Sequence, residues 1–242
     1  MRLEVEGMTA GYGRTEVVQD VSFTVNSGEI LGIIGHNGAG KSTVVKAVGG
    51  LARVFSGRLR LGDQDITGLR PHQMMARGVA MVGQGQDIFP DLTVEENVLM
   101  GGYLLPARRR KERLAHCLSL FPAVYEKRAA KAGTLSGGQR QQLKIARSLM
   151  TEPKLVLVDE PSAGLSPIMR DAAFQMLRDL RDQHGLSVLL VEQNVAGAVS
   201  VADRILVMQA GRVRRVVPTI EIGVSVQLRD LVFDPSMAPP TG

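Results

Sequence analysis

Residues 29–43 read EILGIIGHNGAGKST, and this stretch predicts the centre of the structure. Its first part, Ile30 to Ile34, is apolar and is typical of a strand buried on both faces of a sheet. The second part fits the pattern G-x-x-x-x-G-K-[ST], and Lys41 to Val48 is expected to form a short helix that stops at Gly49-Gly50. A buried strand, a glycine-rich loop and a helix in this order predict a phosphate-binding loop.

The composition of the loop explains how it would hold phosphates. Glycines let the backbone bend so that successive N–H groups point inward, and the N-terminus of the following helix adds a partial positive charge. Lys41 is expected to reach the terminal phosphates, and the Ser42 hydroxyl to bind Mg²⁺. The alternative, a glycine-rich turn with a surface lysine, does not account for the flanking strand and helix. The predicted contacts of an ATP or GTP molecule are Gly35, His36, Asn37, Gly38, Ala39, Gly40, Lys41, Ser42 and Thr43.

A second apolar run ends in two carboxylates. Leu155 to Val158 predicts a buried strand, whose end would deliver Asp159 and Glu160 beside the loop. Asp159 is expected to hold Mg²⁺, directly or through water, and Glu160 to polarise the attacking water. A strand that ends in solvated acids is the alternative, and it would be the better one without the phosphate loop. Together the two motifs predict a nucleotide hydrolase.

Strands and helices alternate over much of the chain, which predicts an α/β fold with a mostly parallel sheet covered by helices on both faces. Between about residues 88 and 150, apolar residues fall instead at helical spacing, which predicts an inserted α-helical subdomain. Turn residues at Gly62-Asp63 and Ala210-Gly211 predict two hairpins. The expected strands are 3–8, 17–25, 30–34, 79–82, 155–158, 187–191, 205–209 and 212–217, and the expected helices of the core are 41–48, 168–181 and one from about 194.

The composition excludes several classes of protein. The chain has 242 residues, of which 44% are hydrophobic and 22% charged, so it forms a core without disulfides and its body is not disordered. The single cysteine, Cys117, indicates a reducing compartment. No apolar run approaches the roughly 18 residues of a membrane-spanning helix. No signal peptide is visible. We therefore expect a cytosolic protein. The basic run from Arg108 to Arg113 is best explained as a solvated helix face. Because the chain has no Trp and only three Tyr to interleave with basic residues, no nucleic-acid partner is expected.

Residues 135–139 read LSGGQ, and this Ser-Gly-Gly turn is expected to open a helix whose N-terminus accepts anionic oxygens. With this motif the chain resembles the ATP-binding cassette (ABC) family, from about Leu3 to Val217. The resemblance implies a P-loop NTPase (RecA-like) core, an antiparallel N-terminal β-subdomain, and ATP and Mg²⁺ as cofactors. It also implies a contact with the γ-phosphate of ATP held by a second subunit, made by Ser136, Gly137, Gly138 and Gln139.

The resemblance assigns roles to further residues. Tyr12, after the first strand, would stack on adenine, and a core or edge tyrosine is the alternative. Gln84 would bind Mg²⁺ or the attacking water and link the core to the helical subdomain. Residues 88–97 (IFPDLTVEEN) resemble the stretch that faces a membrane-embedded partner. Exposed Phe89 and Leu92 would mark an interaction patch there, and ordinary core packing is nearly as good an explanation.

Two residues depart from the usual ABC pattern. Ser166 stands where many cassettes carry an aspartate that supports the dimer interface, and Gln193 stands where most carry a histidine that touches the γ-phosphate. Glutamine donates a hydrogen bond but cannot become cationic, so weaker stabilisation of the transition state is expected. The catalytic residues that the resemblance implies are Glu160, Gln84, Gln193 and Lys41.

Residues 162–167 (SAGLSP) and 191–194 (VEQN) resemble the LivF-type ATPases of branched-chain amino-acid uptake systems and their urea or amide relatives. This implies a bacterial importer subunit, peripheral on the cytoplasmic side of the inner membrane. Its implied partners are a second ABC ATPase, LivG-type or another copy of itself, two permeases and, indirectly, a solute-binding protein. The expected domains are an ABC ATPase domain over residues 1–217 and a partly mobile extension over 218–242.

Three other functions compete with this interpretation. Gln193 and Ser166 favour an ATP-binding subunit with weak or no hydrolysis, which would act as the regulatory half of a pair. A cassette ATPase acting on ribosomes or DNA ends would have a fused second cassette or a long coiled coil, and this sequence shows neither. A small-molecule P-loop kinase would have no use for residues 135–139.

Overall fold

The larger of two β-sheets forms the centre of the computed structural model, which describes residues 1–83 and 88–225. Its strand order is β10-β9-β3-β8-β7-β6, in which neighbours from β9 to β6 pair parallel and β10 pairs antiparallel with β9. This confirms the predicted α/β fold with a mostly parallel sheet. The strands are β3 (Ile30–Gly35), β6 (Val79–Val82), β7 (Leu155–Asp159), β8 (Ser187–Val191), β9 (Arg204–Gln209) and β10 (Arg212–Pro218).

Successive residues of the central strands pack into two different hydrophobic clusters. In β3, Ile30 and Ile34 belong to one cluster, and Leu31 and Ile33 belong to the other. Because side chains alternate across a strand, each apolar run is buried on both of its faces. The apolar runs of the sequence are therefore explained by two cores, one on each side of the sheet.

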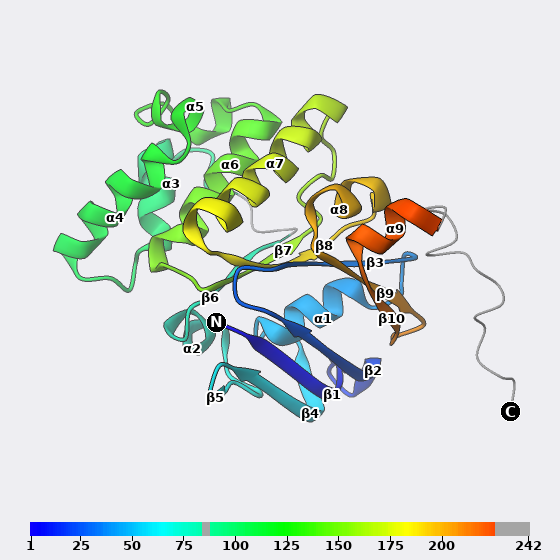
Figure 1. The fold of residues 1–242 in the computed structure, drawn as a ribbon. Coiled ribbons are helices and arrows are strands. Elements are labelled where there is room, and N and C mark those ends of the chain that lie inside the picture. The colour runs from blue at the N-terminus through cyan, green and yellow to red at the C-terminus, as the bar shows by residue number, and fades with distance from the viewer. Residues whose placement is uncertain (84–87, 226–242) are drawn as a thin grey trace, which may run out of the picture.

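One of these cores lies between the parallel sheet and a smaller antiparallel sheet of order β2-β1-β4-β5. Helix α1 (Lys41–Val48) lies between the two sheets, and its Val44, Val45 and Val48 are buried in this core (Figure 1). The predicted antiparallel N-terminal part is confirmed, and the predicted turn at Gly62-Asp63 joins its last two strands. The strands are β1 (Leu3–Tyr12), β2 (Thr15–Val25), β4 (Arg53–Leu61) and β5 (Gln64–Asp65).

Helices cover the other face of the parallel sheet and extend beyond it (Figure 1). The predicted core helices are confirmed as α7 (Pro167–His184) and α8 (Val195–Val201). The segment with helical spacing forms α3 (Val94–Gly101), α4 (Ala107–Ser119), α5 (Pro122–Tyr125) and α6 (Gly137–Ser148), and the chain before it forms α2 (Pro71–Ala76). In the part of the chain that the structure describes, no helix is both long and apolar enough to span a bilayer.

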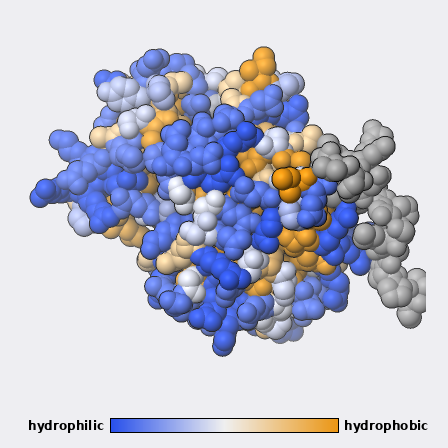
Figure 2. Space-filling view, in the orientation of Figure 1, coloured by the Kyte–Doolittle hydropathy of each residue, from blue (hydrophilic) through white to orange (hydrophobic). Residues whose placement is uncertain are grey.

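Helix α4 carries the basic run of the sequence, and Figure 2 shows a strongly hydrophilic surface at its place on the left of the view. The expectation of a solvated helix face is wrong for one member of the run. The side chain of Arg113 is 16% exposed, and its guanidinium donates a hydrogen bond of 2.8 Å to the backbone oxygen of Leu149. Arg113 thus joins α4 to the end of α6 rather than facing solvent.

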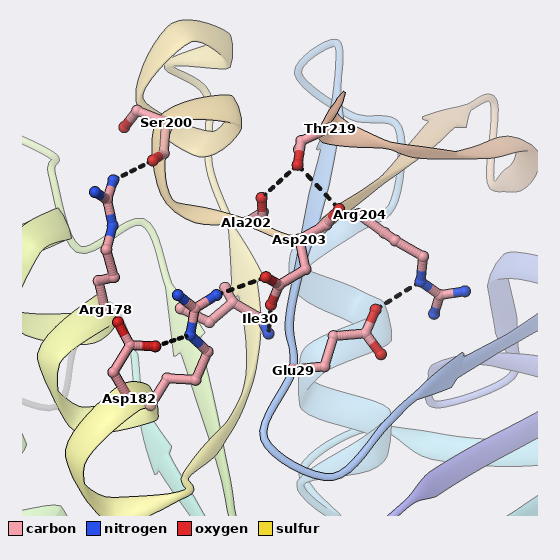
Figure 3. Close-up of polar contacts among 10 residues, drawn as sticks. Glu29, Ile30, Arg178, Asp182, Ser200, Ala202, Asp203, Arg204 and Thr219 are labelled. Atoms are coloured by element: carbon pink, nitrogen blue, oxygen red, sulfur yellow. Dashed lines mark hydrogen bonds and ion pairs between the residues drawn. The ribbon is translucent and has the colours of Figure 1, made fainter. Parts of the chain in front are cut away.

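A polar cluster holds the N-terminal end of β3 (Figure 3). Asp203 accepts a hydrogen bond of 2.8 Å from the backbone N–H of Ile30, and the guanidinium of Arg204 lies 2.5 Å from the carboxylate of Glu29. The hydroxyl of Thr219 donates to the backbone oxygen of Asp203 at 3.0 Å. Thr219 begins α9 (Thr219–Ser225), a helix that the sequence analysis did not predict.

Candidate functional site

The glycine-rich loop has the predicted place, between the end of β3 and the start of α1. Gly38 and Gly40 have φ angles of 80° and 94°, a region that favours glycine. A Cβ atom on Gly40 would also lie only 2.5 Å from a methyl carbon of Val18. The buried ammonium of Lys41 donates hydrogen bonds to the backbone oxygens of Gly35 and His36, at 2.8 and 3.1 Å. The loop therefore holds its own lysine within the curve of the backbone.

A cavity of about 290 Å³ lies over this loop. Residues 37–43 line it, together with Glu160, Gln193 and Val17. The structure thus brings residues 37–43 of the loop together with Glu160 and Gln193, two predicted catalytic residues that lie far from the loop in the sequence. The predicted contacts Gly35 and His36 do not line the cavity. Val17, in β2, was not predicted as a site residue, because a single valine in an alternating strand carries no motif.

Two of the predicted metal ligands, Ser42 and Asp159, lie side by side, and Ser42 lines the cavity. The Ser42 hydroxyl donates a hydrogen bond of 3.0 Å to Oδ1 of Asp159, the last residue of β7. Burial raises the pKa of the Asp159 carboxyl above its ordinary value, and the hydrogen bond from Ser42 partly opposes this shift. A hydroxyl and a carboxylate are oxygen ligands of the kind that Mg²⁺ prefers, so the pair fits this ion. Burial lowers the pKa of the Lys41 ammonium, and the negative charges of Glu160 and Asp159 partly oppose this shift.

Glu160 follows directly on Asp159, and contacts with the end of β8 and the chain after it help to hold it in place. Its backbone has a φ angle of 50°, which is uncommon for a residue other than glycine and marks local strain. Its backbone N–H donates to the oxygen of Val191 at 2.9 Å, and its Oε1 accepts a hydrogen bond of 2.7 Å from Nε2 of Gln193. The carboxylate is thereby presented to the cavity in a defined position.

Glu192 is a buried carboxylate that the sequence analysis did not single out. It is 1% exposed, and its oxygens accept hydrogen bonds from the backbone N–H and hydroxyl of Ser162 and from the backbone N–H groups of Gln193 and Asn194. Burial raises the pKa of its carboxyl, and these hydrogen bonds oppose the shift. The sequence shows only that a charged residue directly follows an apolar strand. This pattern does not predict which loop the side chain of Glu192 contacts.

The predicted nucleotide contacts outside the glycine-rich loop do not line the cavity where the structure describes them. Ser136 caps α6, and its backbone N–H donates to the side chain of Gln139 at 3.1 Å, so the Ser-Gly-Gly turn does open a helix. None of Ser136, Gly137, Gly138 and Gln139 lines the cavity over the loop of this chain. Tyr12 is the last residue of β1 rather than following it, is 44% exposed, and does not line the cavity either. Gln84 lies outside the described residues.

A larger, mostly apolar groove of about 620 Å³ lies between α2, β6, α3 and α6. Phe89 lines it and is 45% exposed, whereas Leu92 is half-buried and does not line it. The buried Asn97 side chain holds the backbone of Phe89 from both sides, accepting from its N–H at 2.8 Å and donating to its oxygen at 2.9 Å. The aromatic ring of Phe89 is therefore presented at a groove rather than packed in a core.

Sequence comparisons relate the chain to transport ATPases. The ABC transporter family model matches residues 18–163. The chain is 40% identical over 211 residues to the high-affinity branched-chain amino acid transport ATP-binding protein BraG of Pseudomonas aeruginosa, covering 87% of this chain and 90% of that protein. It is 38% identical over 206 residues to the probable branched-chain amino acid transport ATP-binding protein LivF of Archaeoglobus fulgidus, covering 85% and 87%. The lipopolysaccharide export system ATP-binding protein LptB of Haemophilus influenzae is 36% identical over 214 residues, covering 87% and 88%.

Solved structures share the fold. The ADP conformation of MJ1267, an ATP-binding cassette of an ABC transporter, aligns with a TM-score of 0.84 at 26% identity, covering 98% of this chain and 97% of that one. A dimeric post-hydrolysis state of the ATP-binding cassette MJ0796, bound to ADP and Pi, aligns with a TM-score of 0.74 at 25% identity, covering 90% and 98%. The resemblance thus extends over nearly the whole chain.

Proposed function

Because the chain belongs to the ABC transporter family, as one of its ATPases, we propose that it hydrolyses ATP to drive a bacterial importer of branched-chain amino acids or related amides. Two of its relatives are named for branched-chain amino acid transport, at 40% and 38% identity. A relative named for lipopolysaccharide export is 36% identical, so sequence identity alone separates import from export only narrowly. The residues around Ser166 and Gln193, which resemble the LivF type, favour import.

The observation that carries the hydrolytic role is the shared cavity of the loop, Glu160 and Gln193. The loop N–H groups and Lys41 would bind the phosphates of ATP, and Glu160 would act as the base toward the attacking water. Gln193 would hold the Glu160 carboxylate and donate toward the γ-phosphate. Ser42 and Asp159 would hold Mg²⁺, which when bound supplies positive charge beside the phosphate oxygens. Gln84 is proposed as a further contact to Mg²⁺ or to the water.

A complete site would need a second cassette. The exposed turn at Ser136 is absent from the cavity lining of its own chain, which supports a role toward ATP bound by another subunit. The ATP-binding cassette MJ0796 has been solved as a dimer bound to ADP and Pi, which supports the pairing of two cassettes. We propose that the second cassette is a LivG-type ATPase or another copy of this chain, and that Tyr12 stacks on adenine at the edge of the site.

The apolar groove would receive the membrane-embedded partners. Phe89 and Met100 are large apolar side chains at this groove that are more than two-fifths exposed, and such surfaces mark interaction sites. We propose that one of two permeases inserts a cytoplasmic segment here while the other docks on the second cassette. The solute-binding protein would act indirectly through the permeases, and the chain would lie on the cytoplasmic side of the inner membrane.

ATP turnover by the purified chain, alone and mixed with a LivG-type partner from the same operon, tests the proposal. We expect turnover in at least one of these samples and its loss in Glu160→Gln, which keeps the size of the side chain but removes the base. Reconstitution with the permeases and solute-binding protein would then show which amino acid or amide is taken up. Efflux of a lipid instead of uptake would overturn the import assignment while leaving ATP hydrolysis intact.

A second candidate is an ATP-binding subunit that hydrolyses weakly or not at all and regulates a competent partner. Gln193 favours it, because a glutamine cannot carry a positive charge to the transition state. Single-turnover hydrolysis in the assembled pair separates the two functions. If ATP bound in the loop of this chain stays intact while the partner's ATP is cleaved, the regulatory role holds.

A further inference from the structure

Glu192 joins two loops that leave neighbouring strands of the parallel sheet. Its Oε1 accepts from the backbone N–H of Ser162 at 3.0 Å, and its Oε2 accepts from the Ser162 hydroxyl at 2.9 Å. The same Oε2 accepts from the backbone N–H groups of Gln193 and Asn194, at 3.2 and 3.4 Å. One side chain therefore fixes the loop after β7 and the loop after β8 relative to each other.

The position of Glu192 in the sheet brings this contact close to the reacting groups. Its own backbone N–H donates to the oxygen of Ile33 in β3 at 3.2 Å, just before the glycine-rich loop. Ser162 lies two residues after Glu160, and Gln193, whose side chain holds Glu160 at 2.7 Å, follows Glu192 directly. The carboxylate thus sits behind the cavity, at the meeting point of the three strand ends that form it.

A charge at this place needs an explanation beyond packing. Burying a carboxylate costs free energy even when it accepts several hydrogen bonds, and a neutral side chain of similar size often gives equal or greater stability. The groups that bond to Glu192 within the described residues are N–H and O–H donors of the two loops, which all require an acceptor. Two negatively charged oxygens can serve all four donors, and no neutral side chain offers the same set of acceptors.

We propose that Glu192 is a positioning residue of the ATPase reaction, which holds the backbone of Gln193 and the Ser162 loop so that Gln193 keeps the Glu160 carboxylate in place. The proposal rests on the function proposed above for Glu160. Glu192 would act through Gln193 and Ser162 and would not contact the nucleotide.

Glu192→Gln tests the proposal because it keeps the shape of the side chain but replaces one acceptor oxygen with an NH2 donor. An amide nitrogen in place of Oε1 would face the backbone N–H of Ser162, and in place of Oε2 it would face the N–H groups of Gln193 and Asn194. Donors would meet donors in either orientation. Ser162→Ala removes one donor and leaves the backbone contact, so its effect should be smaller, and Ser162→Thr should restore the wild-type behaviour because it keeps a hydroxyl.

The matched control is Glu29→Gln, at the opposite end of the parallel sheet. Glu29 is 7% exposed, and its carboxylate contacts the guanidinium of Arg204 at 2.5 Å (Figure 3). The same carboxylate accepts a hydrogen bond of 2.6 Å from the backbone N–H of Asn26. Its replacement also removes a buried charge, far from the cavity over the loop. We therefore expect Glu29→Gln to lower the melting temperature without changing kcat.

Steady-state ATP turnover and amide hydrogen exchange together test the proposal. Both are measured on the full chain, at a temperature below the melting temperature of every variant. We expect Glu192→Gln to lower kcat by roughly ten- to a hundredfold, with the KM for ATP changed by less than about threefold. We also expect faster amide exchange in the peptides that contain Ser162 and Gln193, and unchanged exchange there in Glu29→Gln.

Three results overturn the proposal: an unchanged kcat in Glu192→Gln, unchanged exchange at both loops, or a fall in kcat that Glu29→Gln reproduces. A wild-type chain that turns over no ATP, alone or with its partner, would refute hydrolysis by this subunit. Hydrogen exchange would still decide whether Glu192 holds the two loops, so failure of the proposed function and failure of this inference are distinguishable.

Discussion

Nε2 of Gln193 donates a hydrogen bond of 2.7 Å to Oε1 of Glu160, across 33 residues of sequence. This contact links the end of β8 to the end of β7 at the mouth of the cavity. The amide of Gln193 fixes the carboxylate that would act as the base, so the residue that departs from the usual ABC pattern is built into the site. A role in orientation does not require a positive charge, which is what glutamine lacks.

Gln193→Ala should therefore lower turnover without preventing ATP binding. We expect kcat to fall by roughly a hundredfold, the size typical of removing one preorganised donor, and the KM for ATP to change little. Gln193→His should retain turnover and should add an ionisation to the pH profile of kcat, because imidazole ordinarily titrates near pH 6.5. Profiles of kcat from pH 5.5 to 9 for the three proteins check this. Identical profiles for wild type and Gln193→His would show that this side chain does not act in the rate-limiting step.

Asp159→Asn should stabilise the nucleotide-free chain at neutral pH. Burial raises the pKa of this carboxyl above its ordinary 3.8, so the folded state binds the proton more tightly than the unfolded state. The contribution of the Asp159 carboxyl to the free energy of unfolding accordingly falls as the pH rises from 3.8 through the raised pKa. The amide of the Asp159→Asn variant does not ionise, so the variant does not lose this stability. We expect a gain of roughly 1 kcal/mol at pH 8, which shrinks toward pH 4, while Mg²⁺-dependent turnover is lost.

Thermal melts at several pH values test this, with Asp65→Asn as the control of opposite sign. Hydrogen bonds from Thr67 lower the pKa of the exposed Asp65 carboxyl, so its contribution to stability is present above pH 3.8 and is lost on acidification. Asp65→Asn should therefore lower the melting temperature at neutral pH. If Asp159→Asn behaves in the same way, burial is not the dominant influence on Asp159.

The local patterns of the sequence predicted the parts of the site that depend on neighbours along the chain. The glycines of residues 35–40 determine the loop, and the apolar runs that precede it and Asp159 determine buried strands, because both effects act over a few residues. The bond between Ser162 and Glu192 was not predictable in this way, since it depends on two loops that meet only after β7 pairs with β8. Helix α9 escaped prediction because its seven residues give too short a periodic pattern.

Cys117 should be inert toward thiol reagents in the folded chain. It is fully buried in the α4 region, and burial raises the pKa of its thiol to about 11. At pH 8 only about one thousandth of such a thiol is the reactive thiolate. We expect reaction with a disulfide reagent such as dithionitrobenzoate to be at least about a hundredfold slower than for free cysteine, and complete within the mixing time in guanidinium chloride. Rapid labelling of the native chain would mean that the helical region opens readily.

Phe89→Ala should weaken assembly with the permeases while leaving nucleotide binding intact. The ring of Phe89 is 45% exposed at the apolar groove, with the guanidinium of Arg147 at 5.8 Å from its centroid. Tyr125→Ala is a matched control, because Tyr125 is 46% exposed, has the guanidinium of Arg128 at 4.6 Å, and lies outside the groove. Co-purification with the permeases of the same operon in detergent provides the measurement. A buried aromatic anchor at an interface is worth at least about 2 kcal/mol, so we expect a loss of roughly thirtyfold in affinity for Phe89→Ala only. Equal losses for both variants, or none for either, would mean that the permeases dock elsewhere on the chain.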